Sequence, residues 1–562
     1  MRANRLPAAP FLLFSIAEKR LFVNPLICSV SEAAAVWDKP SPLRIDCQEG
    51  VLCLSEKMLS AGKGALFLTA LSAISQALGF CYRVVLSRLV GAEVMGLYQL
   101  VMPVYSVILS LTAVGLTSAV SNLTSQHLAL GNRRGADQTI SACLKFFFLL
   151  LLPVGTAVIL GSDAISVYLL GDARTQLGLI LLIPCVALTG VENFHKHFFY
   201  GSGVVRPPAI VELLEQFVRT FAVITLLLLF LPQYPERVVG LIVTGMVLCE
   251  VFSSCTLVVL YHRRRGPLTG RGEESRVRRR RIFSIALPVG LNALLGNLLS
   301  AANSALIPQK LVEGGVERSA AVSQFGVVCG MTMPMLSLPI VFLGALNLVL
   351  VPRLSRACAL DRPGEARRLI SQAVSAVALL TLPCMAMMVV VGSDLGRAMF
   401  HQEGVGEYLV PLACAVAMNC GTSVLASSLN GLGRQRAVAV ISLLGGGVQL
   451  GFTLALVPLP GVGMGGYVAG AVASAALELV LCLRQVVRAT DMEVQPFQWL
   501  AAPGLAAALA GLVSNLLFRV LKDAGLSQLS AGGATLAFAL ILYLAALQAQ
   551  GVRARDVLRL DW

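Results

Sequence analysis

The chain alternates long apolar segments with short polar ones. From Lys63 onward we count fourteen apolar runs, and each is near or above the ~20 residues that a helix needs to cross a bilayer. The pattern therefore predicts an all-α membrane protein with fourteen transmembrane helices. The runs span residues 64–87, 97–121, 140–161, 177–199, 208–231, 238–261, 282–306, 322–351, 367–392, 408–429, 436–457, 463–485, 497–520 and 530–549.

Charged residues are few, and most basic ones lie between the apolar runs. Only 13% of the 562 residues are charged, against about 25% in soluble proteins. The formal net charge of +14 does not indicate nucleic-acid binding, because the cations form short clusters in loops. With the start of the helical core in the cytoplasm, most Arg and Lys residues fall in inner loops, as the positive-inside rule requires. Both termini of the core are then expected to be cytoplasmic.

The sequence also repeats itself at an offset of 230 residues. Segment 201–220 aligns with 431–450, and the same offset places the loop 121–141 over 351–371. The repeat unit contains six predicted helices, an even number, so both copies insert in the same orientation, related by an axis along the membrane normal. We expect two pseudo-symmetric six-helix lobes that face each other across a central cavity, a plan typical of transporters.

The expected domains derive from this repeat. Residues 1–57 do not resemble the rest of the chain, and we expect a poorly ordered extension there, with the true start of the protein close to Met58. The first lobe would span 58–262 (helices 1–6), a basic cytoplasmic linker 263–281, the second lobe 282–488 (helices 7–12), and helices 13–14 with a cytoplasmic tail 489–562.

Polar side chains inside the predicted helices are the candidate site residues, because a charge in lipid costs at least ~2.5–3.5 kcal/mol. Gln76 and Arg83 belong to a polar stripe on the first helix, with steps of three and four residues. In the fifth helix Glu215, Gln216 and Arg219 share one face. These stripes favour the wall of a transport cavity; the alternative is a helix–helix seam, with Glu215 and Arg219 as a structural ion pair.

Four further polar residues extend the candidate set. Asn292 and Asn297 lie in the seventh helix, where Pro288 and Gly290 permit bending. Glu250 in the sixth helix and Glu478 in the twelfth are candidate ion-coupling residues, for a proton or sodium. Each of these acids is alternatively a buried group paired with a neighbour.

Several chemistries are excluded by missing motifs. No G-x-x-x-x-G-K-[ST] motif and no plausible nucleophile–His–acid set occurs, so we expect neither ATP hydrolysis nor any other enzyme activity, and no catalytic residues or cofactor. The 14 cysteines contain no C-x-x-C, and His195 and His197 are two residues apart, which splits their rings around a helix. No metal site is therefore expected.

The segment GFCYRVVLSRLVGAEVMGLYQL (79–100) resembles the opening of the stage V sporulation protein B family. That family belongs to the multidrug/oligosaccharidyl-lipid/polysaccharide exporter superfamily, which also includes the MurJ lipid II flippases. The E-Q-x-x-R pattern at 215–219 is similar to the family's helix 5 signature. The chain departs from the family at Lys196–Gly201, where KHFFYG replaces R-G-Y-F-Q-G, so no role is assigned to the family's glutamine there.

The resemblance implies a flippase in a bacterial cell membrane. Its cargo would be a polyprenyl-diphosphate-linked cell-wall precursor similar to lipid II, for the spore cortex, moved by alternating access. Arg83 and Arg219 would contact the diphosphate, since arginine binds phosphate bidentately. Partners would be this anionic lipid-linked sugar, membrane lipids and peptidoglycan synthases, but no nucleic acid. The alternatives are a cation-coupled multidrug exporter that uses Glu215 and Glu250, and a non-transporting scaffold for wall synthesis.

Overall fold

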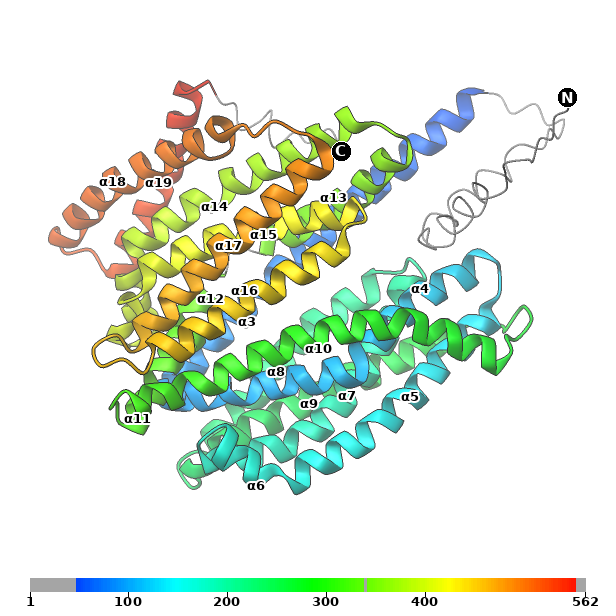
Figure 1. Ribbon diagram of the computed structural model, residues 1–562, viewed down its shortest axis with the longest axis horizontal. Helices are drawn as coiled ribbons and strands as arrows, with labels where there is room; N and C mark the ends of the chain where they lie inside the picture. The colour runs from blue at the N-terminus through cyan, green and yellow to red at the C-terminus, as the bar shows by residue number, and fades with distance from the viewer. Residues whose placement is uncertain (1–46, 338–340, 552–562) are drawn as a thin grey trace, which may run out of the picture.

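A computed structural model describes residues 47–337 and 341–551, and these residues are helical with no strand among them (Figure 1). Within these described ranges, thirteen helical stretches are long and apolar enough to cross a membrane. One of them, Leu71–Ala129, has 59 residues and holds the first two predicted runs. The chain bends between these runs at Gly91, whose φ of 77° favours glycine. The all-α membrane architecture is thus confirmed. The thirteen stretches correspond to the fourteen predicted runs, because the first stretch overlaps two of them and each of the others overlaps one.

The helices of the first half carry most of the candidate residues; η denotes short π- or 3₁₀-helical segments. The elements of this half are α3 (Cys47–Leu109), η2 (Ser110–Val114), α4 (Gly115–Ala129), α5 (Arg133–Leu160), α6 (Ser162–Ala164), η3 (Ile165–Leu169), η4 (Ala173–Thr175), α7 (Gln176–Gly201), α8 (Arg206–Phe230), η5 (Pro235–Arg237) and α9 (Val238–Arg264).

The helices of the second half begin after the basic linker. They are α10 (Ser275–Glu313), α11 (Arg318–Phe325), η6 (Gly326–Thr332), α12 (Met333–Leu336), α13 (Val341–Ala359), α14 (Pro363–Phe400), η8 (Glu403–Gly406), α15 (Leu409–Gly431), α16 (Gln435–Leu456), α17 (Met464–Thr490), η9 (Phe497–Ala501), α18 (Ala502–Asp523) and α19 (Gln528–Ala549). Residues 275–281 of the predicted linker therefore already belong to α10.

Two groups of helices pack side by side. In the first, α4, α5, α7, α8 and α9 contact one another, and in the second α13 to α17 do the same (Figure 1). Both α3 and α10 contact helices of both groups, so they join the lobes. The last two helices, α18 and α19, pack on the outer side of α14. Of the expected terminal segments, residues 1–46 and 552–562 lie outside the described residues, and Cys47–Lys57 form the start of α3.

The backbone repeats at the same offset as the sequence. Helix α7 ends at Gly201 and α15 ends at Gly431. Two residues later, Gly203 and Gly433 have φ values of 73° and 75°, which glycine adopts without steric cost. A tight turn of the same kind thus leads into α8 and into α16. Matching helix ends and matching turns support a duplicated six-helix unit.

The lobes contact each other at one end of the molecule, which we call the Gly91 end. There Gly96 of α3 lies so close to α11 that an added Cβ would collide with the Val322 carbonyl. A Cβ on Gly326, the first residue of η6, would collide with the Ala92 carbonyl of α3. Arg88 also reaches α14, where its Nη2 donates to the Ala398 carbonyl over 2.7 Å. These contacts hold the lobes together at this end.

At the opposite end, which we call the linker end, the basic linker folds onto the first lobe. Asn132 Nδ2 donates to the Arg271 carbonyl over 3.0 Å, and Arg281 Nη2 of α10 donates to Gln126 Oε1 of α4 over 2.7 Å. The start of α10 is thereby fixed beside α4.

Candidate functional site

A cavity of about 660 Å³ lies between the lobes. Its walls come from α3, α7, α8 and α9 of the first lobe and from Cys329 to Ser337 of the second. The structure brings six of the predicted residues together in this cavity: Gln76, Arg83, Glu215, Gln216, Arg219 and Glu250. Gly79 allows this arrangement, because a Cβ there would lie 3.2 Å from Gln216 Nε2 and would push that side chain away.

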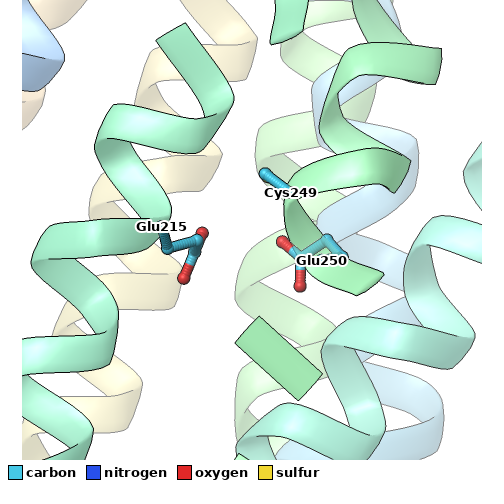
Figure 2. A group of neighbouring side chains, drawn as sticks. All are labelled: Glu215, Cys249 and Glu250. Atoms are coloured by element: carbon cyan, nitrogen blue, oxygen red, sulfur yellow. The ribbon is translucent and has the colours of Figure 1, made fainter. Parts of the chain in front are cut away.

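Arg219 is enclosed by acceptors from α8 and α9. Its Nη2 pairs with Glu215 Oε1 one turn earlier, and lies 3.5 Å from Glu250 Oε1. Its Nε donates to Cys249 Sγ over 3.4 Å. Figure 2 shows the carboxyl groups of Glu215 and Glu250 pointing toward each other across the space between the two helices. The Glu215 and Glu250 side chains are only 10% and 3% exposed, so the ion pairs are shielded from water.

This cluster has the donor atoms of a cation site. One ligand atom each from Glu215, Cys249 and Glu250 lies within 4.8 Å of the others (Figure 2). Two carboxylates and a thiol are ligands that divalent metals accept. However, the guanidinium of Arg219 bonds to the same three side chains and already supplies their counter-charge. The geometry therefore describes a protein cation held by its own carboxylates.

A third acid lies beside this cluster. Glu250 Oε2 is buried without a hydrogen-bond partner among the described residues, and its neighbour is the carboxyl group of Glu192. Ser253 Oγ donates to Glu192 Oε2 over 2.9 Å. Two adjacent buried carboxyl groups repel each other when both are ionised, and one proton between them removes the repulsion. Glu192 and Glu250 therefore form a pair of adjacent buried carboxyl groups next to Arg219.

Arg83 differs from Arg219 in its surroundings. It lines the same cavity from α3 and is half-buried, yet among the described residues it has neither an ion pair nor a hydrogen bond. The aromatic rings of Tyr82 and Tyr98, both buried, are its neighbours. The cavity thus contains one cation whose charge is not compensated by the described protein.

The exposure of the acidic side chains decreases from the linker end of the cavity inward, from 47% at Glu212 to 10% at Glu215 and 3% at Glu250. Lys196 of α7 forms an ion pair of 2.8 Å with Glu212 of α8. Since the lobes contact each other at the Gly91 end, the cavity communicates with water at the linker end.

Three predicted residues lie outside this cavity. Asn297 lines a neighbouring space of about 200 Å³ and donates from Nδ2 to the Ser106 carbonyl over 3.3 Å. Asn292 is exposed on α10 and lines neither space. Glu478 of α17 packs against Gly445 of α16, away from the other candidates.

The sequence patterns missed part of the lining. Tyr82, Tyr98 and Tyr105 line the cavity together with Thr189 and Glu192. Tyr105 donates to Thr189 Oγ1 over 3.0 Å, which connects α3 to α7. These residues could have been noticed in the sequence, because each carries a polar group within an apolar run. Periodicity within one helix, however, does not show which helices meet.

Comparison with known proteins identifies the family. The profile of the family described as "Polysaccharide biosynthesis protein" matches residues 61–358, more than half of the chain. The chain belongs to this family. It is 25% identical to stage V sporulation protein B of Bacillus subtilis over 409 residues, which cover 72% of this chain and 79% of the relative. It is 22% identical to the lipid II flippase MurJ of the same organism over 443 residues, 72% and 78% of the two chains.

Solved structures share the fold. The inward closed conformation of the lipid II flippase MurJ superposes with a TM-score of 0.63 at 10% identity, over 88% of this chain and all of that one. An inward-facing multidrug resistance transporter of the MATE family gives a TM-score of 0.57 at 14% identity, over 76% and 96%. These comparisons confirm the resemblance to the sporulation family, the exporter superfamily and the multi-pass membrane architecture.

Proposed function

We propose that this family member is a transporter, not an enzyme, and that it flips a lipid-linked anionic sugar precursor across a bacterial cell membrane. Two curated relatives support this proposal: the one named a lipid II flippase and the one named a stage V sporulation protein. We assign the cargo to polyprenyl-diphosphate-linked intermediates of the lipid II type, used for the spore cortex. Its head group would enter the cavity between the lobes while its tail stays in lipid.

The observation that carries the proposal is the uncompensated charge of Arg83. A half-buried arginine without a counter-ion is costly in the resting protein and favourable once an anion arrives. Its planar guanidinium offers two parallel donors to a phosphate group. The tyrosines beside it add hydroxyl groups and flat apolar faces of the kind that contact sugars. Arg83 is therefore the primary diphosphate contact.

Arg219 would be the second contact, made available by proton uptake. Glu215 and Glu250 now occupy its guanidinium, so a diphosphate has to compete with them. Protonating Glu250, which lies next to Glu192, weakens that competition. Cargo binding and proton binding would then favour each other, which couples transport to a proton gradient. We place the coupling group at Glu250 rather than Glu478, because only Glu250 contacts Arg219.

The proposed orientation puts the linker end in the cytoplasm, in keeping with the distribution of basic loops. In this state the cavity is open to the side on which lipid-linked precursors are assembled, and it is closed at the Gly91 end. Alternating access then requires the contacts at the Gly91 end to separate.

Translocation of lipid II in reconstituted proteoliposomes tests the function. The wild-type chain is expected to move lipid II, and Arg83→Gln is expected to abolish most of the movement. Arg434→Gln is the matched control, since Arg434 is an exposed arginine outside the cavity. Absence of movement by folded wild-type protein with lipid II and with other polyprenyl-diphosphate sugars would contradict the proposal.

A second function is favoured by one observation. The acids that line the cavity (Glu192, Glu212, Glu215 and Glu250) outnumber its cations (Arg83, Lys196 and Arg219). An acidic cavity suits export of organic cations in exchange for protons, and one structural neighbour is a multidrug transporter. Efflux of a cationic dye that is lost in Glu250→Gln but kept in Arg83→Gln would favour this function over the flippase.

A further inference from the structure

A groove separate from the central cavity lies between α16 and α17 near the linker end. Its volume is about 400 Å³, and it shares no lining residue with the cavity between the lobes. Three arginines form its rim: Arg436 in the first turn of α16, and Arg484 and Arg488 near the end of α17. All three are exposed.

The rim concentrates positive charge without a counter-charge. Among the described residues, none of the three arginines forms an ion pair. Arg484 and Arg488 are spaced i, i+4 on one helix face, an arrangement in which like charges repel. The amino-terminal end of α16, beside Arg436, adds the positive end of a helix dipole. An anion between the two helices would compensate the charges of all three arginines and the helix dipole at once.

Below the rim, the groove becomes apolar. Val440 and Leu444 come after Arg436 at i+4 and i+8 on α16, and their side chains are 56% and 52% exposed. At 1.5 Å per residue they extend the groove about 12 Å toward the membrane interior. Leu481 lines the facing wall one turn before Arg484, and Ile441 is buried at the base. Such exposed aliphatic side chains on a transmembrane helix are suited to contact acyl chains.

We propose that this groove binds an anionic glycerophospholipid of the inner leaflet. The phosphate would lie among Arg436, Arg484 and Arg488, and an acyl chain would lie along Val440 and Leu444. A free phosphate would leave the apolar walls uncovered, and a neutral lipid would leave the arginines uncompensated. Because α16 contacts both α17 and α10, a lipid bound here would stabilise the second lobe next to a helix that joins the two lobes. This inference does not depend on the cargo proposed above.

Native mass spectrometry of the full-length protein, titrated with phosphatidylglycerol or with phosphatidylcholine of the same acyl chains, tests the proposal. The wild type is expected to hold one phosphatidylglycerol more tightly than any phosphatidylcholine. Each single change, such as Arg484→Gln, is expected to weaken it about fivefold, because one arginine near an anionic lipid contributes about that much. The triple variant R436Q/R484Q/R488Q is expected to lose the bound lipid.

The matched control is R276Q/R279Q/R280Q, which removes three exposed arginines from the start of α10 at the same end of the molecule. It is expected to keep the tight phosphatidylglycerol. Equal loss in both triple variants would overturn the site, because the arginines would then act only as diffuse surface charge. Equal binding of both lipids by the wild type would also overturn it.

A second measurement uses the unmodified protein and does not depend on how the variants fold. Phosphatidylglycerol that carries a photoreactive diazirine in its acyl chain is expected to label residues 437–444 of α16 or the Leu481 region of α17. Labelling confined to other helices would contradict the proposed groove.

Discussion

Gly96 and Gly326 lie against each other at equivalent positions of the two repeats, separated by the offset of 230 residues that aligns the lobes. A Cβ on Gly326 would lie 2.6 Å from the Gly96 nitrogen, and the flanking partners Ala92 and Val322 are equivalent as well. Only glycine allows backbones to approach this closely within a membrane. The contact that closes the Gly91 end is therefore made by the same surface of both copies.

Gly96→Ala is expected to open the Gly91 end. The added methyl group meets the Val322 backbone carbonyl, and overpacking of this kind costs about 1–3 kcal/mol. The readout is labelling of Cys329, which lines the cavity, by a maleimide added at the outer face. Gly451→Ala is the control, because a Cβ there has nothing within 4 Å. Unchanged labelling in Gly96→Ala would show that this contact does not control access.

Arg83→Gln is expected to weaken binding of undecaprenyl diphosphate by about 10- to 100-fold, the loss of a hydrogen-bonded charged contact of about 1.5–3 kcal/mol. Arg83→Lys should recover only part of the affinity, since lysine keeps the charge but not the bidentate geometry. Titration by intrinsic fluorescence or calorimetry gives both values. Full affinity in Arg83→Gln would remove this residue from the substrate site.

Glu250→Gln is expected to change how binding depends on pH. In the wild type, undecaprenyl diphosphate should bind more tightly as pH falls, because proton uptake by the carboxyl groups frees Arg219. The glutamine has no charge, so its variant should bind tightly at high pH and respond less to pH. Glu236→Gln is the control, an exposed acid in a loop. A wild type with pH-independent binding would contradict the competition for Arg219.

The Gly91 end is expected to become less stable in acid, because Asp172 then loses its interaction with Arg174. Partial burial favours its neutral form, but hydrogen bonds from Arg174 outweigh this and hold the pKa of Asp172 below its usual value. A lowered pKa in the folded state means that the stabilisation is present above the unfolded-state pKa and is lost as pH falls through the folded-state value. Asp172→Asn should therefore lower the melting temperature slightly at neutral pH and not at low pH. An equal decrease at every pH would point to lost packing instead.

The orientation predicts which loops are accessible from outside the cell. In intact cells, a cysteine placed at Glu236, in a loop of the Gly91 end, should react with a membrane-impermeant maleimide. A cysteine placed at Thr269 in the basic linker should react only after the membrane is opened. The reverse pattern would invert the proposed orientation and the side from which cargo enters.

The sequence predicted the fold well because its signals are local or periodic. Apolar length defined the helices, and the turn at Gly203 and Gly433 recurs with the duplication. The contacts between side chains of different helices were harder to predict from the sequence. Glu215 and Arg219 were expected to pair because they share one helix, whereas the contact of Arg219 with Glu250 depends on how α8 packs against α9. The exposure of Asn292 could not be predicted for the same reason, because the sequence of one helix does not show which of its faces the neighbouring helices cover.

The crossing of Gly96 and Gly326 has a consequence for how this chain arose. A surface that contacts its own equivalent across a two-fold axis is isologous, which is the defining property of a C₂ homodimer interface. If a single six-helix unit preceded the duplication, two such units would already have been able to associate through Ala92 and Gly96. Fusion of the two genes would then have made a symmetric subunit contact permanent. Later substitutions, such as those that left Arg219 in one copy and Gln449 at the equivalent position of the other, would have given each half its own chemistry.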